Sequence, residues 1–254
     1  MDQQNILDYI SFRVATRYLK KNKVYDEILE ITKASKSAGV SLIDFAALYE
    51  YVKRYKPQYV LECGTGLSTH VLASAMEKYC KPLYPEIRLV SMESEDVWHK
   101  EATKYFDFNK YDFVDIELSA VAGHRYSFIS GVVYENVPSF PYDFVFVDGP
   151  NYKDQCDMDF IKVVENSEKK VSALIDSRRT SAIAYAALVG RDKILYHPFG
   201  FSHVTGVTKN SLVLSSKKSL HHSFDENIPR TNSMFVKGFV ISALLCFLPM
   251  RMFD

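Results

Sequence analysis

Acidic side chains stand at the end of most of the strands that the sequence predicts. Four residues share this position, each after a run of mainly apolar residues: Glu62, Glu93, Asp148 and Asp176. An unpaired carboxylate is costly beside an apolar core, so a buried strand alone does not account for these acids. In an open parallel sheet, ligands bind at the carboxyl ends of the strands. The pattern therefore predicts a binding site built from strand ends.

Two glycines follow the first of these acids. Gly64 and Gly66 permit a tight turn and a close approach of the backbone to a ligand, and a helix begins at about residue 67. Glu93 lies 27 residues beyond Gly66, at the end of the next predicted strand. There its carboxylate can accept hydrogen bonds from two vicinal ribose hydroxyls, as in nucleotide-binding βαβ folds. The spacing indicates a cofactor that carries a ribose.

The glycine turn departs from the fingerprints of phosphate-binding loops. A dinucleotide site requires G-x-G-x-x-G, and Thr69 stands where the third glycine belongs. A P-loop requires Gly-Lys-Ser/Thr, which this sequence lacks here. Glu62 beside the glycines would repel a pyrophosphate, whereas it suits a cofactor with a cationic amino group. S-adenosylmethionine has that amino group together with a ribose and a sulfonium.

At these residues the sequence resembles the class I S-adenosylmethionine-dependent methyltransferases. Three stretches carry the resemblance: LYEYVKRYKPQYVLECGTGLSTHVLA, LVSMES and YDFVFVDGPNY. The third is most similar to the small-molecule O-methyltransferases, whose fourth strand reads roughly YDxxFxDG. The resemblance covers about residues 41–216. It implies a Rossmann-like, doubly wound, mainly parallel seven-stranded sheet with helices on both faces and an antiparallel edge strand.

The resemblance also implies a role for each matching position. The methionine end of the cofactor would be lined by Glu62, Gly64, Thr65 and Gly66, with Ser68 and Thr69 near its carboxylate. Glu93 would hold the ribose, Ser94 one edge of the adenine, and Ser119 with Ala120 its other side. Asp148 would stand where the methyl donor and the acceptor meet.

The proton of the acceptor hydroxyl can be handled in more than one way. In catechol-type relatives, the acid after strand four and an Asp-Asn pair after strand five bind Mg²⁺, which acidifies the hydroxyl. Asp148 and Asp176 match two of these ligands, but Ser177 replaces the Asn. The alternatives are a divalent cation such as Mg²⁺ at Asp148 and Asp176, or Asp148 as a general base without metal. His203, in a predicted loop before the last strand, is a second candidate catalytic base.

Apolar runs that alternate with helical patterns predict the sheet. The predicted strands are residues 58–63, 87–93, 112–118, 142–148, 171–176, 193–197 and 211–216. No helix separates the last two, so we expect them to pair antiparallel at one edge. Helices are predicted between the earlier strands, and Asp157 and Asp159 are expected to be solvated at the start of one of them. The aromatic-rich segment 119–141 is either a functional loop or a surface hairpin.

These elements divide the chain into three predicted parts. Residues 1–40 form a helical extension, residues 41–216 the cofactor-binding domain, and residues 217–254 a C-terminal extension with an apolar tail. The tail, residues 238–250, is about 20 Å long as a helix, which is short of a membrane span. It is expected to pack on the body of the protein, with a peripheral membrane contact or a contact between copies of the chain as alternatives.

Composition narrows the class of partner and compartment. The 254 residues carry 31 basic and 31 acidic side chains, so the formal net charge is zero. No overall positive electrostatic potential therefore favours binding of nucleic acid. The four cysteines are scattered and contain no CxxC pair, which is typical of a reducing, cytoplasmic location and predicts neither a disulfide framework nor a zinc site. The polar N-terminus, MDQQN, lacks the layout of a secretory signal.

The sequence thus favours an S-adenosylmethionine-dependent methyltransferase that modifies a hydroxyl of a small molecule or a sugar. A nicotinamide-dependent oxidoreductase or a sugar-nucleotide enzyme on a Rossmann sheet is one alternative. A non-catalytic module of a larger assembly is another. Thr69 in place of a third glycine and the position of Glu62 both count against the oxidoreductase.

Overall fold

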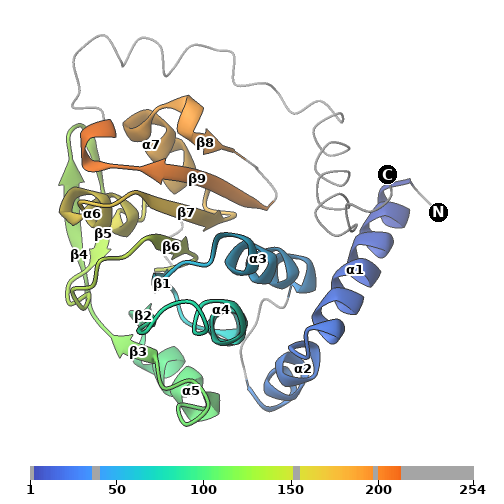
Figure 1. The fold of residues 1–254 in the computed structure, drawn as a ribbon. Coiled ribbons are helices and arrows are strands. Elements are labelled where there is room, and N and C mark those ends of the chain that lie inside the picture. The colour runs from blue at the N-terminus through green and yellow to red at the C-terminus, as the bar shows by residue number, and fades with distance from the viewer. Residues whose placement is uncertain (1–2, 36–40, 151–154, 197–199, 213–254) are drawn as a thin grey trace.

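The computed structural model describes residues 3–35, 41–150, 155–196 and 200–212. Seven strands form the main sheet, in the order β3-β2-β1-β6-β7-β9-β8 (Figure 1). Their bounds are β1 Tyr59–Cys63, β2 Arg88–Glu93, β3 Val114–Leu118, β6 Phe144–Val147, β7 Val171–Asp176, β8 Ile194–Leu195 and β9 Phe201–Val207. The first five strands in this order pair parallel, and β9 pairs antiparallel with both β7 and β8. The predicted fold class is confirmed.

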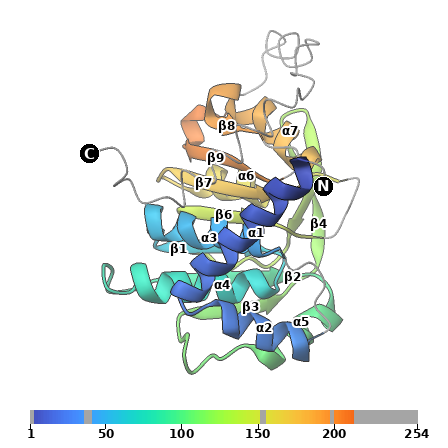
Figure 2. The same cartoon turned by 90° about the vertical axis from the view of Figure 1, so that its right-hand side faces the viewer.

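Helices cover both faces of this sheet and bury two separate apolar layers (Figures 1 and 2). On one face lie α3 Leu42–Tyr55, α4 Leu67–Tyr79 and α5 Asp96–Tyr105, and on the other lie α6 Asp159–Asn166 and α7 Arg179–Val189. Side chains alternate between the layers because successive residues of a strand point to opposite faces. In β1, Val60 belongs to the first layer, whereas Leu61 and Cys63 belong to the second.

Two further helices extend the first layer. The helix α1 Gln3–Lys21 packs on α3, and α2 Tyr25–Ala34 packs on α4 (Figure 2). Buried apolar side chains of both helices, Leu19 and Ile28 among them, join the same core cluster as α3 and α4. The predicted boundary at residue 40 stays a prediction, and the one at residue 216 lies outside the described residues.

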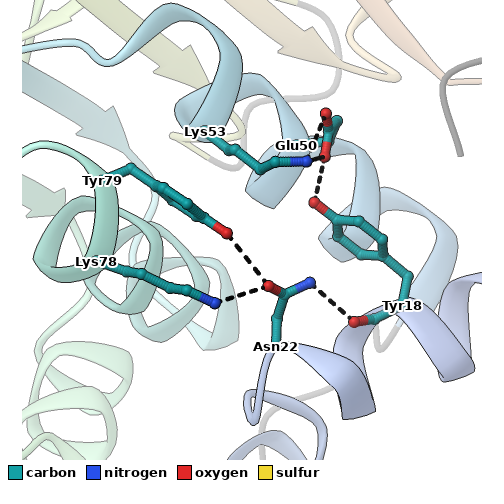
Figure 3. A network of polar contacts seen from close by, with 6 residues as sticks. All are labelled: Tyr18, Asn22, Glu50, Lys53, Lys78 and Tyr79. Carbon is teal, nitrogen blue, oxygen red and sulfur yellow. Dashed lines mark hydrogen bonds and ion pairs between the residues drawn. The ribbon is translucent and has the colours of Figure 1, made fainter. Parts of the chain in front are cut away.

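Polar side chains fasten α1 to its neighbours at two points (Figure 3). Tyr18 of α1 donates a hydrogen bond to Glu50 of α3, and Lys53 also donates to Glu50, at 2.8 Å. Asn22 follows α1 and accepts from Lys78 of α4 at 3.0 Å and from the Tyr79 hydroxyl at 3.3 Å. The bonds from Tyr18 to Glu50 and from Lys78 to Asn22 each involve a charged group, and such bonds contribute about 1.5–3 kcal/mol. Because they hold α1 at two separate points, they orient the helix as well as attach it.

The end of the sheet differs from the prediction. The last strand was expected at residues 211–216, but β9 covers Phe201–Val207, and Lys209–Ser211 is a turn of 3-10 helix. Residues 213–216 lie outside the described residues. The segment FSHVTGV contains a histidine and a glycine, and its alternation of buried and less buried residues is weak as a sequence pattern. Pairing with strands on both sides stabilises it as a strand.

The aromatic segment is a hairpin. Its strands, β4 Val121–Tyr126 and β5 Ile129–Tyr134, pair antiparallel and form a second, two-stranded sheet. The segment before α6 hydrogen-bonds to β5, since Val132 N donates to Cys156 O at 2.9 Å and Met158 N donates to Val132 O at 2.8 Å. Asp157 and Asp159 are consequently 2% and 1% exposed, so the prediction that they are solvated is wrong.

Among the described residues, no helix has the length and apolarity that crossing a membrane requires. The apolar tail, residues 238–250, lies outside the described residues, and its predicted contacts stay predictions.

Replacing Ile28 by Ala tests whether α2 belongs to the folded core. Ile28 is fully buried, so we expect the free energy of unfolding to fall by about 2–4 kcal/mol. Ile10, on α1, is 39% exposed, and Ile10→Ala is the matched control, with an expected change below about 0.5 kcal/mol. Denaturant unfolding monitored by circular dichroism measures both. Equal stability of the two variants would show that α2 is dispensable for the core.

Candidate functional site

A cavity of about 280 Å³ lies at the carboxyl ends of β1, β2 and β6. Residues 64–67 form one wall, directly after β1, and residues 148–150 form another, directly after β6. Glu93 closes the cavity at the end of β2, and Trp98 and Tyr105 border it from α5. The cavity also reaches Ile31 of α2, so an N-terminal helix contributes to the site. The strand ends meet as the sequence predicts.

The two glycine-containing turns touch each other through their backbones. Gly64 has a φ of +92°, a conformation that other residues rarely adopt, and its N–H donates to Met92 O at 2.9 Å. A Cβ added to Gly149 would lie 2.5 Å from Gly64 Cα and 2.6 Å from Gly64 N. Side chains at these two positions are therefore excluded. The backbone of both turns consequently forms the floor of the cavity.

Thr69, in the first turn of α4, holds the glycine turn in place. Its hydroxyl donates to Glu62 Oε2 at 2.6 Å and accepts from Gly66 N at 3.1 Å. The hydroxyl oxygens of Thr65 and Ser91 lie 3.2 and 3.3 Å from it. The residue that replaces the third glycine of a dinucleotide fingerprint thus connects the acid to the turn.

Glu62 lies beneath the wall of the cavity, whereas the sequence predicts that it lines the binding site. Its side chain is 0% exposed and does not line the cavity, because the turn and Thr69 cover it. Within the described part of the chain, Oε1 has no hydrogen-bond partner. Burial raises the pKa of Glu62 to about 7, and hydrogen bonds from the Ser68, Thr69 and Ser91 side chains oppose the rise. The site therefore contains an acid that titrates near neutrality.

Glu93 matches its predicted position at the cavity. Its Oε1 accepts hydrogen bonds from Ser94 N at 2.7 Å and Glu95 N at 2.9 Å, which fix the carboxylate. The described residues give its second oxygen, Oε2, no partner. Ser119 N donates to Glu93 O at 2.8 Å, which ties the end of β3 to the end of β2. Neither Ser94, Ser119 nor Ala120 lines the cavity.

A second cavity of about 120 Å³ adjoins the first and shares Thr65, Gly66, Leu67 and Asp148 with it. Three carboxyl side chains line it, from α3, from the end of β6 and from the end of β7: Asp44, Asp148 and Asp176. Three phenylalanines line it as well: Phe45, Phe146 and Phe201. No lysine or arginine is among the described residues of its wall. The predicted residue Ser68 lies here, at the start of α4.

Asp148 lies between the two cavities, and its side chain is 42% exposed. Burial by the surrounding protein and the neighbouring Asp176 raise the pKa of Asp148 well above its ordinary value, and Arg178 opposes this rise. One guanidinium nitrogen of Arg178 lies 3.8 Å from Asp148 Oδ1, and Arg178 also donates to the carbonyls of Asp148 and Pro150. Arg178 thus positions the turn after β6.

Among the described residues, no third acidic ligand joins the expected metal pair of Asp148 and Asp176. Asp148 and Asp176 line the same cavity, but Asp44, Asp148 and Asp176 do not bring carboxylate oxygens within 4.8 Å of one another. Ser177, in place of the expected Asn, has a positive φ of 50°. These residues therefore fit a metal ion poorly. The divalent cation expected at Asp148 and Asp176 stays a prediction that the geometry does not favour.

The structure does not bring His203 to either cavity. Its ring contacts Tyr51 and Tyr55 of α3, with centroid distances of 5.1 and 5.8 Å. Burial lowers the pKa of His203, and in the described part of the chain its Nε2 has no hydrogen-bond partner. The residue was predicted in a loop, whereas it lies within β9, where the strand directs the ring toward α3. This geometry does not support a role for His203 as a base.

The cavity residues that had no part in the sequence prediction include Trp98, Tyr134 and Arg178. Arg178 follows a strand end that was already singled out, and Trp98 is the one tryptophan of the chain. Tyr134 could not be found in this way, since the hairpin that carries it had not been placed against the sheet. A signal in the sequence thus existed for two of the three.

Comparisons with known proteins give a partial picture. No family model matches the chain, and no curated protein matches it. Among solved structures, the chain is similar to the cofactor-bound protein Rv0187 from MTB, with 14% identity, a TM-score of 0.48, and coverage of 73% of this chain and 90% of that one.

Two further solved structures are O-methyltransferases. One, from Bacillus cereus in complex with SAH, has 16% identity, a TM-score of 0.47, and coverage of 73% and 91%. The other, TomG from Streptomyces achromogenes in complex with SAM, has 16% identity, a TM-score of 0.45, and coverage of 78% and 89%. At these values the likeness carries no functional argument, and the function of this chain rests on its own site.

Replacing Glu62 by Gln should flatten the dependence of stability on pH. The folded-state pKa of Glu62 is raised to about 7 from an ordinary 4.5, so its stabilising contribution is present below pH 4.5 and is lost as the pH rises to 7. Between about pH 5 and pH 8, the wild type should therefore lose about 2–3 kcal/mol more unfolding free energy than Glu62→Gln. Urea unfolding at several pH values measures this, with exposed Glu117→Gln as control. Parallel curves for wild type and Glu62→Gln would contradict the assignment.

Proposed function

We propose that the chain is an S-adenosylmethionine-dependent methyltransferase that acts on a hydroxyl of a small molecule or a sugar. The observation that carries this proposal is one cavity that joins a glycine turn at a helix N-terminus, a fixed carboxylate at the end of β2, and Asp148 at the end of β6. Glycine in this turn lets the backbone approach a ligand closely. Glu93 suits a ribose diol, since both hydroxyls can donate to its carboxylate.

Electrostatics favour a cationic cofactor over a pyrophosphate. Glu62 lies directly under the turn, and Glu93 and Asp148 face the cavity. The N-terminus of α4 attracts anions, but the carboxylate of Glu93, and those of Glu62 and Asp148 when they are ionised, oppose a doubly charged phosphate linkage. A cofactor that carries a sulfonium and an ammonium group is compatible with this charge, and its own carboxylate suits the helix N-terminus.

The sheet topology also separates this chain from the dinucleotide-binding alternative. The dinucleotide fold has the strand order 3-2-1-4-5-6 in a parallel sheet. Here β9 is inserted antiparallel between β7 and β8. Thr69 fills the position of the third glycine and is needed there for its bond to Glu62. Both features support a methyl donor and oppose a nicotinamide cofactor.

The transfer itself needs alignment and a proton acceptor. S-adenosylmethionine, held by Glu93 and the glycine turn, would supply the methyl group to the acceptor hydroxyl and would be released as S-adenosylhomocysteine. Asp148, with its raised pKa, takes the hydroxyl proton as general base. Arg178 keeps the turn that carries Asp148 in position. No step of this scheme requires a metal ion.

The second cavity suits an acceptor without negative charge. The carboxyl groups of Asp44 and Asp176 can accept hydrogen bonds from several hydroxyls, and they repel anions. The rings of Phe45, Phe146 and Phe201 offer apolar faces to a sugar ring or a small aromatic compound. An acceptor seated there would present a hydroxyl to Asp148, which borders both cavities.

Calorimetry with S-adenosylhomocysteine and with NAD tests the cofactor. We expect S-adenosylhomocysteine to bind and NAD not to bind. Glu93→Gln should weaken binding about tenfold or more, because hydrogen bonds to a charged group contribute about 1.5–3 kcal/mol. Glu117→Gln, at an exposed position of β3, is the control and should bind like the wild type. Binding of NAD alone would overturn the proposal.

Asp148→Asn separates an enzyme from a non-catalytic module. With a panel of hydroxylated acceptors and release of S-adenosylhomocysteine as readout, turnover should fall about 10²–10⁴-fold, since general-base catalysis is lost. Cofactor affinity should change far less. Wild-type turnover should rise as the pH increases through the raised pKa of Asp148, because the base acts when deprotonated. Asp192→Asn, whose side chain is 78% exposed, is the matched control. Undiminished turnover in Asp148→Asn would exclude this base.

A further inference from the structure

Three potential metal ligands converge in the apolar layer behind the cofactor cavity. One sulfur or carboxylate oxygen from each of Cys63, Asp157 and Asp159 lies within 4.8 Å of the other two. Cys63 is fully buried, and the two aspartates are 2% and 1% exposed. The proposed methyl transfer uses none of these residues. Two buried carboxylates beside a thiol are costly unless something compensates their charge.

Backbone contacts fix the position of the cluster. Cys63 is the last residue of β1, next to the glycine turn. Asp157 forms a bridge with Val132 of β5, and both carboxylate oxygens of Asp159 accept from Tyr134 N at 3.2 Å. The cluster therefore joins the main sheet to the hairpin. Cys63 and Asp159 lie in regular secondary structure and Asp157 is held by its bridge to β5, which favours a defined coordination geometry.

Only one of the two carboxylate oxygens of Asp157 has hydrogen-bond partners among the described residues. Its Oδ1 accepts from Asp159 N at 3.0 Å and from the Tyr185 hydroxyl at 3.1 Å. Its Oδ2 is buried and has no hydrogen-bond partner within the described residues. No lysine or arginine from those residues forms an ion pair with Asp157 or Asp159. A buried carboxylate oxygen in this state calls for a cation or a proton.

A fourth polar group supplies an independent indication. The hydroxyl of Tyr134 is fully buried and likewise has no hydrogen-bond partner in the described part of the chain. The backbone N–H of the same residue donates to Asp159, so Tyr134 adjoins the cluster. An unpaired hydroxyl in this position suits a water molecule or another ligand held on an ion.

We propose that Cys63, Asp157 and Asp159 bind one divalent transition-metal ion, with Zn²⁺ as the best match. A thiolate with two carboxylates is a ligand set that Zn²⁺ accepts, whereas Mg²⁺ and Ca²⁺ prefer oxygen ligands alone. Three protein ligands leave a fourth position of a tetrahedral site for a water molecule. The ion compensates the two buried carboxylates and links β1 to the segment that precedes α6.

Cobalt substitution tests this site directly. The full chain is stripped of metal with a chelator, dialysed, and titrated with Co²⁺, whose bond to a thiolate gives a near-ultraviolet charge-transfer band. We expect the band to saturate at one ion per chain in the wild type. Cys63→Ser should lose it, and Asp159→Asn should weaken Co²⁺ binding. Cys80→Ser is the matched control, since Cys80 is also buried and free but lies outside the cluster, and it should keep the band.

A second measurement guards against loss of folding in Cys63→Ser. Zn²⁺ should raise the midpoint of thermal unfolding of the stripped wild type and of Cys80→Ser, because a ligand that binds the folded state stabilises it. It should leave the midpoint of Cys63→Ser unchanged, with circular dichroism showing that this variant is folded. Absence of the band and of the thermal shift in the wild type would overturn the proposal. The band persisting in Cys63→Ser would do so as well.

Discussion

The contact between the backbones of Gly64 and Gly149 is the constraint on which the site depends. A Cβ on either glycine would lie under 3.0 Å from backbone atoms of the other turn, and no side-chain rotamer relieves such an overlap. The ends of β1 and β6 can therefore approach only with glycine at both positions. That approach places Asp148 beside the turn that precedes α4, so the groups proposed to bind a cofactor and those proposed to face an acceptor share one edge of the sheet.

The glycine turn after β1 rests on Glu62, an acid whose burial costs free energy. Glu62 has no exposed surface, and the hydrogen bond from Thr69 offsets only part of the desolvation of its carboxyl group. A protonated Glu62 costs less, which explains the direction of its pKa shift. When ionised, Glu62 favours a cationic ligand above the turn, whereas an uncharged side chain of similar shape would keep the hydrogen bond without any negative potential.

The sequence was sufficient to predict which acidic residues end the strands. It was insufficient to predict how deeply each of these residues is buried. The acids that end β1, β2, β6 and β7 were identified from residue order alone, because parallel strands carry their carboxyl ends to one edge. Whether such an acid lies on the wall or beneath it depends on the next helix. Thr69 covers Glu62, whereas a backbone turn leaves Glu93 at the cavity. A residue pattern contains no direct information on that covering layer.

Tertiary pairing explains the remaining differences in the same way. β9 has weak alternation but gains partners on both sides, and Asp157 and Asp159 have the composition of a solvated helix start until the hairpin covers them. In β1, adjacent residues point to opposite faces of the sheet and therefore lie in different environments. Glu62 points to the layer of α4 and Cys63 to the layer of α6, each as a buried titratable group at the end of the strand. One strand thus supports the glycine turn on one face and carries the proposed metal ligand Cys63 on the other.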